Sequence, residues 1–290
     1  MDMQQIIERI DEQYRTLPGN ELPNEIFLCT SALFDKPIVG FGSADDELFE
    51  QYKKIGIIGP WHLSPKEWLL EAKTIVSMFF PINENVRRHN AAQNDMASKE
   101  WAFTRVECQA FIGRFMQELR DWLVESGTAA CVPAIDPRFT YIRGGKVIAA
   151  QPAPIPGEDG DVGDEDLDSS IYSSAWSERH AAYVCGLGTF CLSKGLITEK
   201  GVAGRYASVI IDTEIERSAR PYTGIYDYCT KCGACAARCP AGAIDLLNGK
   251  DHVKCAAYLH KCTPLLKPYY GCGLCQTGVP CEAGIPWKEI

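Results

Sequence analysis

The sequence has no long hydrophobic run, no excess of basic residues and no glycine loop of a nucleotide-binding type. Its best apolar stretch, residues 75–81, is far shorter than the roughly 20 residues that cross a bilayer, so we expect no membrane span. Acidic residues outnumber basic ones, 38 to 29, and the net charge of −9 disfavours nucleic acid as a partner. The amino terminus lacks the basic and apolar regions of a signal peptide, which predicts a cytoplasmic protein with reduced cysteines.

Cysteine, in contrast, is abundant, with 14 residues in the chain. A C-x₂-C-x₂-C-x₃-C-P run that ends at Pro240 contains Cys229, Cys232, Cys235 and Cys239. A short loop with a cysteine at every third position can place thiolates at the corners of a [4Fe–4S] cluster. A second set contains Cys255, Cys272, Cys275 and Cys281. The sequence therefore predicts two [4Fe–4S] clusters and single-electron chemistry.

In such a run the last cysteine ligates the other cluster. We therefore assign one cluster to Cys229, Cys232, Cys235 and Cys281, and the other to Cys239, Cys255, Cys272 and Cys275. The second set is less regular than the first, and Cys262 is a rival of Cys255 for one ligand position. Zinc sites usually use two separated C-x₂-C pairs, and a reducing compartment disfavours disulfides, so both are weaker interpretations.

Helix and strand patterns alternate through residues 1–225, which favours an α/β layer fold. Apolar periodicity predicts helices at 6–17, 107–126 and 174–184, and short apolar runs predict strands at 74–80, 129–134, 146–149 and 206–212. From residue 226 the composition shifts to cysteine and glycine, so residues 226–290 are predicted to form a ferredoxin-like module with two clusters. A ferredoxin alone would not need so long a preceding segment, which argues for a substrate site.

Seven acidic residues between Glu158 and Asp168 are predicted to form a solvated loop. A calcium loop is the alternative, but the glycine and glutamate spacing of an EF-hand is absent.

A second informative segment is WSERHAAYVCGLGTF at 176–190, followed by Leu-Ile-Thr at 196–198 and Ser-Val-Ile-Ile-Asp-Thr at 208–213. Together with the cysteine module it resembles the epoxyqueuosine reductases and, more distantly, the reductive dehalogenases. The matching residues are Gly186, Leu187 and Gly188, then Cys255 with Ala-Ala-Tyr-Leu, and the Gly-Cys-Gly-Leu-Cys-Gln segment at 271–276. The resemblance implies a nitroreductase-like α+β core that binds cobalamin at the Gly-Leu-Gly turn. One cluster would lie close to the corrin, and electrons from an external donor of the ferredoxin or flavodoxin type would pass through the clusters to cobalt.

The chain also departs from this family. It ends at Ile290, where epoxyqueuosine reductases usually continue into helical repeats that hold tRNA, so we expect a small-molecule substrate and no tRNA. The position of the family's aspartate acid falls at or near Tyr172, and reductive dehalogenases use a tyrosine as proton donor. We therefore name Tyr172 as the candidate donor, with His180 and Asp168 as further candidates. Two rival functions remain: an electron-transfer protein without its own substrate, and a flavin-dependent reductase, since the same fold binds flavin elsewhere.

Overall fold

The structure is a computed structural model that describes residues 1–23, 27, 31–144, 146–149 and 172–287. The acidic tract that was predicted to form a solvated loop, including the candidate Asp168, lies outside the described residues.

The centre of the fold is a four-stranded sheet in the order β1-β2-β9-β3. Its strands are β1 (Ile38–Ser43), β2 (Thr74–Pro81), β9 (Gly204–Ile211) and β3 (Ala130–Cys131). Each neighbouring pair is antiparallel. The mixture of helix and strand is therefore confirmed, but the sheet is of the α+β kind, because β2 pairs with the distant β9 and not with the next strand in the chain.

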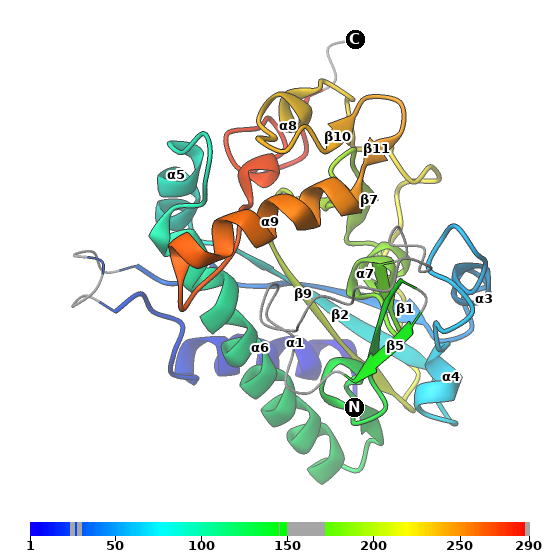
Figure 1. Ribbon diagram of the computed structural model, residues 1–290. Coiled ribbons are helices and arrows are strands. Elements are labelled where there is room, and N and C mark those ends of the chain that lie inside the picture. The colour runs from blue at the N-terminus through cyan, green and yellow to red at the C-terminus, as the bar shows by residue number, and fades with distance from the viewer. Residues whose placement is uncertain (24–26, 28–30, 145, 150–171, 288–290) are drawn as a thin grey trace.

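Helices cover both faces of this sheet (Figure 1). On one face lie α1 (Met3–Thr16) and α6 (Lys99–Glu125), and on the other lie α3 (Leu48–Tyr52), α4 (Pro65–Trp68) and α7 (Glu178–Val184). Side chains of a strand alternate between faces. In β2, Val76 and Phe80 therefore pack under α1 and α6, whereas Ile75 packs under α7. Every residue of β2 is buried, as its continuous apolar run predicts.

The predicted helices form, but their bounds differ. Helix α6 begins eight residues before the predicted start, because the side chain of Ser98 caps it by accepting a hydrogen bond from Trp101 N at 3.1 Å. The helix predicted at 174–184 begins only at Glu178, since Tyr172–Ser174 forms β6. That strand pairs with β4 (Thr140–Arg143), which also pairs with β5 (Lys146–Ala149).

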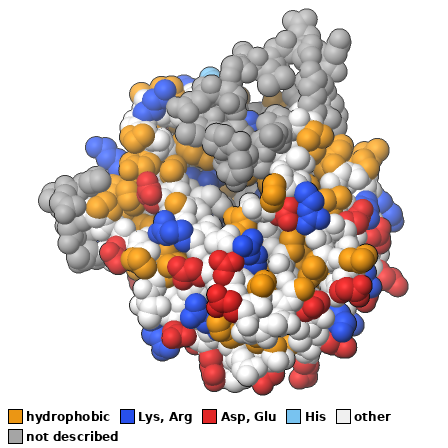
Figure 2. All heavy atoms as spheres, turned by 90° about the horizontal axis from the view of Figure 1, so that it is seen from below, with side chains coloured by type: hydrophobic (Ala, Val, Ile, Leu, Met, Phe, Trp, Pro, Cys, Tyr) orange, Lys and Arg blue, Asp and Glu red, His pale blue; other side chains and the backbone are white. Residues whose placement is uncertain are grey.

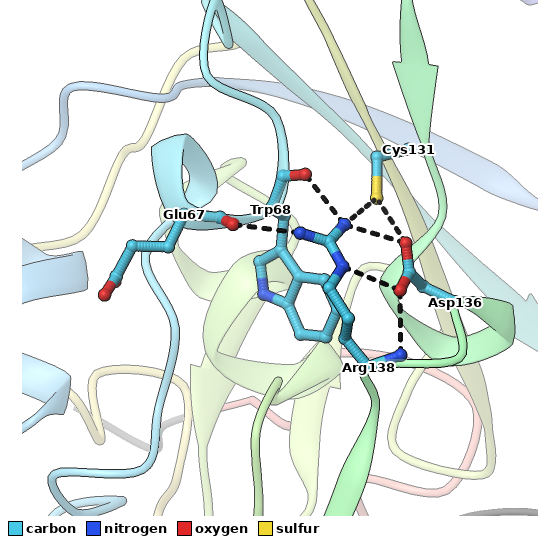
Figure 3. Close-up of polar contacts among 5 residues, drawn as sticks. All are labelled: Glu67, Trp68, Cys131, Asp136 and Arg138. Carbon is cyan, nitrogen blue, oxygen red and sulfur yellow. Dashed lines mark hydrogen bonds and ion pairs between the residues drawn. The ribbon is translucent and has the colours of Figure 1, made fainter.

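Arg138 connects α4 to the segment after β3 (Figure 3). Its guanidinium donates to the carbonyl oxygens of Glu67 and Trp68 at 3.1 and 2.9 Å and lies 5.0 Å from the Trp68 ring centroid. It also donates to the carboxylate of Asp136 at 2.8 Å, which lowers the pKa of Asp136 to about 2. The loop that precedes β4, and with it the β4–β6 pair, is thereby held against the sheet.

The carboxy-terminal segment contains α8 (Ala234–Ala237), β10 (Ile244–Asp245), β11 (Gly249–Lys250), α9 (His252–Leu266) and the 3₁₀ turn η2 (Leu274–Gln276). Figure 1 shows α9 running from beside β11 toward the start of α6. There Tyr269 packs edge-on against Phe103, with ring centroids 5.0 Å apart. Across the described part of the chain, no helix combines the length and the apolar character that a membrane crossing requires.

Helix α7 is attached to the sheet by a chain of hydrogen bonds. Trp176 Nε1 donates to Ser208 Oγ at 2.9 Å, and Ser208 Oγ donates to Glu178 Oε2 at 2.6 Å. The other oxygen, Oε1, is buried without a partner among the described residues. Burial raises the pKa of the Glu178 carboxyl to about 7, because ionisation there is poorly solvated.

The Gly-Leu-Gly turn after α7 lets the backbone pass close to its neighbours. Gly186 has φ +81°, and a Cβ on it would lie 2.4 Å from the carbonyl oxygen of Ala219. A Cβ on Gly188 would lie 1.9 Å from the carbonyl oxygen of Ile197, because Gly188 opens β7 (Gly188–Phe190), which pairs with β8 (Leu196–Thr198). These glycines therefore have a packing role in the fold, and their role toward a corrinoid stays a prediction.

We expect Gly188→Ala to lower stability by at least about 2 kcal/mol, since a new methyl group meets backbone that cannot swing away. The matched control is Gly113→Ala in α6, where no atom lies within 4 Å of the added Cβ and where alanine favours helix by up to about 1 kcal/mol. Thermal unfolding of both variants without added cofactor measures the difference. An unchanged Gly188→Ala protein would contradict the packing role.

We expect Glu178→Gln to change the pH dependence of stability. The folded-state pKa of about 7 lies above the ordinary value of ~4.3, so the wild type is fully stabilised below pH ~4 and loses stability as pH rises through 7. The glutamine variant avoids this loss and should be more stable by roughly 3 kcal/mol at pH 8, but by much less at pH 5. Unfolding at the two pH values tests this, with the exposed Glu47→Gln as the control for charge removal. Equal effects of Glu178→Gln at both pH values would contradict the shift.

Candidate iron–sulfur and redox site

The four cysteines assigned to one cluster surround a single cavity. Cys229, Cys232, Cys235 and Cys281 line one small cavity between the first cysteine run and the carboxy-terminal loop. The run wraps this space because Gly233 adopts a left-handed conformation, with φ +78°, and starts α8. We call these four residues the first cysteine group. Cys232 is its exposed member, and Cys235 is buried.

The other four assigned cysteines also interact with one another. The thiol of Cys272 lies within electrostatic reach of Cys239, Cys255 and Cys275, and Cys275 lies within reach of Cys239 and Cys255. Three segments supply them: the end of the first run, the first turns of α9 and the η2 turn. We call these residues the second cysteine group. The partition into two groups of four is the one expected from the sequence; the roles of these cysteines as ligands stay a prediction.

The donor set in each group suits iron. Burial and neighbouring thiols raise the pKa of Cys235 and of Cys272 to about 12, so these groups hold protons until a metal replaces them. Among the described residues, no three of His, Cys, Asp or Glu are placed to hold a single metal ion. A cubane instead takes one thiolate at each of four irons. Four thiols around one cavity are the donor set that such a cluster requires.

Two further cysteines lie near the groups. Cys191, which lies outside both predicted cysteine sets, is buried at the first group's cavity and lies within electrostatic reach of Cys235 and Cys275. Its spacing gave no signal of this position. Cys262, the rival of Cys255, is buried one turn after Tyr258 and interacts with that phenol.

The carboxy-terminal loop that carries Cys272 and Cys281 is fixed to the rest of the fold by polar contacts. Asn90, in α5 (Glu84–Ala91), donates to the carbonyl oxygen of Cys272 at 3.1 Å and to Thr277 Oγ1 at 3.0 Å. Arg87 forms an ion pair with Glu282 at 2.8 Å, and Val202 N donates to the carbonyl oxygen of Cys281 at 2.9 Å. These contacts set where the fourth cysteine of the first group stands.

The candidate proton donor Tyr172 lies beside the start of α9. Its side chain is 50% exposed, and its ring stacks on that of His252 with centroids 6.2 Å apart. Arg143 lies 5.3 Å from the ring centroid and donates to the Tyr172 hydroxyl at 3.5 Å. Because His252 precedes Cys255 by three residues on α9, Tyr172 is brought toward the second cysteine group and not toward the exposed Cys232.

The candidate His180 is packed among aromatic rings. Its imidazole lies 4.6 Å from the ring of Tyr52 and 4.8 Å from that of Phe190, and Nδ1 lies 2.7 Å from Ser177 Oγ. Burial and the charge of Arg179 lower its pKa to about 3, so the ring is neutral at pH 7. A catalytic role for His180 stays a prediction.

Comparison with known proteins supports the cysteine module and the fold. A family model described as a 4Fe-4S binding domain matches residues 222–245, which include the first cysteine run. No curated protein matches the sequence. Among solved structures, an epoxyqueuosine reductase from Bacillus subtilis gives a TM-score of 0.51 at 16% identity, covering 98% of this chain and 67% of that protein.

Two further structures are similar. An epoxyqueuosine reductase with a tRNA-Tyr epoxyqueuosine-modified stem loop gives a TM-score of 0.50, with the same identity and coverage. A catabolic reductive dehalogenase gives 0.49 at 16% identity, covering 86% of this chain and 30% of that protein. At these identities the likeness concerns the fold. The chain thus shares the fold of epoxyqueuosine reductase and contains a segment of the 4Fe–4S binding type.

Proposed function

We propose that this chain is an iron–sulfur reductase with two [4Fe–4S] clusters, which carries electrons from a surface donor to a substrate site beside Tyr172. The observation that carries the proposal is the separation of eight cysteines into two groups with different surroundings. One group includes a solvent-exposed member, and the other lies at the helix start that contacts Tyr172.

The first cysteine group is the entry point for electrons. Cys232 is exposed, and Leu246 lies against the adjacent Gly233, 3.2 Å from where a Cβ would be. Leu247, on the same turn between β10 and β11, is 92% exposed. An exposed apolar surface beside a cluster suits brief docking of a ferredoxin- or flavodoxin-type donor.

A corrinoid is the cofactor that we propose for the reductive step, and two orphaned donors support its fit. Arg143 Nε and Arg205 Nε are buried without hydrogen-bond partners among the described residues. Arg205 lies near Arg105, whose guanidinium is 5.0 Å from the Tyr270 ring, and these groups would bind the amide oxygens of a corrin rim. When bound, cobalamin would supply a low-valent cobalt for reductive cleavage. The chain's own residues orient the ligand, exclude water and deliver a proton.

Tyr172 is the residue that we propose to deliver this proton. Its phenol has access to solvent, and Arg143 donates a hydrogen bond to its hydroxyl oxygen at 3.5 Å. His252, whose ring stacks on that of Tyr172, has its pKa lowered to about 4 by burial and by Lys194, so it holds the phenol in place as a neutral ring.

The substrate that we propose is a small molecule and not tRNA. Figure 2 shows the face of the molecule that lies away from the cysteine module, and acidic and basic side chains are interspersed on this face. The net charge of −9 points the same way.

Cluster content tests the first part of the proposal. Anaerobically reconstituted protein should contain about eight irons and eight sulfides per chain. Cys232→Ser and Cys272→Ser should each lose about half of this iron and should remove different electron paramagnetic resonance signals from the reduced protein. Cys262→Ser and the buried, distant Cys108→Ser serve as controls and should retain both clusters. Four irons in the wild type, or loss of a cluster in Cys262→Ser, would contradict the assignment.

Substitution of Tyr172 tests the second part. Tyr172→Phe should retain both clusters and corrinoid binding, while reductive cleavage of a halogenated or epoxide model compound falls by about 10²–10⁴-fold. The control is Tyr14→Phe, whose hydroxyl donates to Phe34 O on the far face of the sheet. Unchanged turnover would indicate that Tyr172 contributes to packing and does not donate the proton.

Tight binding of flavin with no spectral response to cobalamin would favour the flavin-dependent alternative.

A further inference from the structure

Three cations from separate segments meet beside the second cysteine group. They are Arg179 on α7, Lys194 in the turn between β7 and β8, and Lys250 on β11, and we call them the cation group. Arg179 Nη1 donates to the carbonyl oxygen of Lys194 at 2.6 Å. The charge of Lys194 interacts with those of Lys250 and Arg179, and Lys250 interacts with Arg179. Within the described ranges, no carboxylate forms an ion pair with any of the three.

The acidic group that interacts with Lys194 is already engaged. Asp251 accepts a hydrogen bond from Lys254 N at 3.1 Å, which caps α9, and lies 3.9 Å from Lys254 Nζ. Its charge reaches Lys194, so among the described residues the three cations share one carboxylate, and that carboxylate is already engaged. In a chain of net charge −9, three cations grouped in this way within the described residues are unusual.

Two side chains of the cation group are accessible to solvent, although the protein around them disfavours their charged forms. Arg179 and Lys194 are exposed, but the surrounding protein lowers the pKa of both. Like charges that crowd in this way repel each other. An anion that approaches from solvent relieves the repulsion and interacts strongly, because protein replaces part of the water around it.

The backbone at Lys194 gives a second observation. This residue has φ +58°, in the left-handed region where glycine or asparagine is favoured. Its amide closes a tight turn by donating to Cys191 O at 2.8 Å. Glycine would fit this turn with less strain, so the presence of lysine indicates a use for its side chain.

Charge compensation of an iron–sulfur cluster is the competing explanation, and it accounts for part of the cation group. Lys250 interacts with Cys255 and Cys275, and Arg179 interacts with Cys275, so both charges face the second cysteine group. Lys194 has no cysteine among the groups that shift its pKa; its partners are Lys250, Arg179 and Asp251. Lys194 is therefore left for another anion.

We propose that the cation group binds a phosphate-bearing ligand next to Tyr172. Arg179 places the site beside the proposed proton donor, because its charge interacts with the Tyr172 phenol. Guanidinium and ammonium groups together are the usual partners of phosphate oxygens. As a statement about the substrate, this inference rests on the proposed function, but phosphate binding itself does not require turnover.

Calorimetric titration of cluster-loaded protein with inorganic pyrophosphate tests the site. The wild type should bind saturably, and Lys194→Ala should bind at least tenfold more weakly. Lys194→Gly should lose binding equally while its thermal midpoint stays equal or rises, since glycine relieves the positive φ. The exposed Lys200→Ala, in the next turn of the same segment, is the matched control and should bind as the wild type does.

Three results would overturn the proposal. They are the absence of saturable binding, equal weakening in Lys200→Ala, and binding that occurs in cluster-free protein but vanishes once the clusters are loaded. The last result would assign the cations to cluster charge. Iron content and the electron paramagnetic resonance spectrum are recorded on the same samples. Intact clusters without pyrophosphate binding contradict this inference alone, whereas missing clusters contradict the proposed function.

The phosphate could belong to the substrate or to the nucleotide tail of a corrinoid, and two ligands separate these sources. Cobinamide lacks the phosphodiester tail that cobalamin carries. If Lys194→Ala weakens the binding of cobalamin but not of cobinamide, the phosphate is that of the cofactor. If both corrinoids bind normally and pyrophosphate still binds beside them, the phosphate belongs to a separate ligand. Either result supports phosphate recognition by the cation group.

Discussion

The arrangement of the cysteines depends on the hydrogen bonds that the side-chain amide of Asn90 forms. This residue is fully buried, and its oxygen accepts a hydrogen bond from Ser98 N at 3.0 Å, directly before α6. Its nitrogen donates to Cys272 O and to Thr277 Oγ1. One side chain thus joins α5, the start of α6 and the loop of the second cysteine segment. A buried amide with all these partners has one favourable placement, so the loop is positioned by the core and not by the cysteines alone.

The sequence predicted those features in which local pattern and burial agree. The cysteine spacing, the apolar face of α6 and the continuous apolar run of β2 all lie where their patterns indicated. Strand β1 was missed because Gly40 and Gly42 resemble loop residues. They are glycines because α7 lies so close that a Cβ on Gly40 would be 2.3 Å from Cys185 O. Helix α9 was not predicted, because its segment was assigned only to the cysteine-rich module as a whole.

The site was less accessible to sequence reasoning because its charges come from distant segments. Arg143, Arg179, Lys194 and Lys250 lie on four different elements or turns, and no spacing rule connects them. The net charge of −9 indicates the opposite character for the surface as a whole. Tyr172 was named through a family resemblance, and its partners Arg143 and His252 emerge only when β6 pairs with β4 and α9 begins beside it.

The positions of the two cysteine groups define the direction in which electrons would cross the molecule under the proposed function. Cys191 is buried between them, since its thiol interacts with Cys235 of the first group and Cys275 of the second. Under the proposed function, clusters held by groups that share such a neighbour would pass an electron from one to the other without a mobile carrier. The exposed Cys232 lies at one end of this path, and Tyr172 with the cation group lies at the other. A donor that docks at Cys232 and a ligand that binds at Tyr172 would therefore occupy separate surfaces, and both could be bound while an electron is transferred.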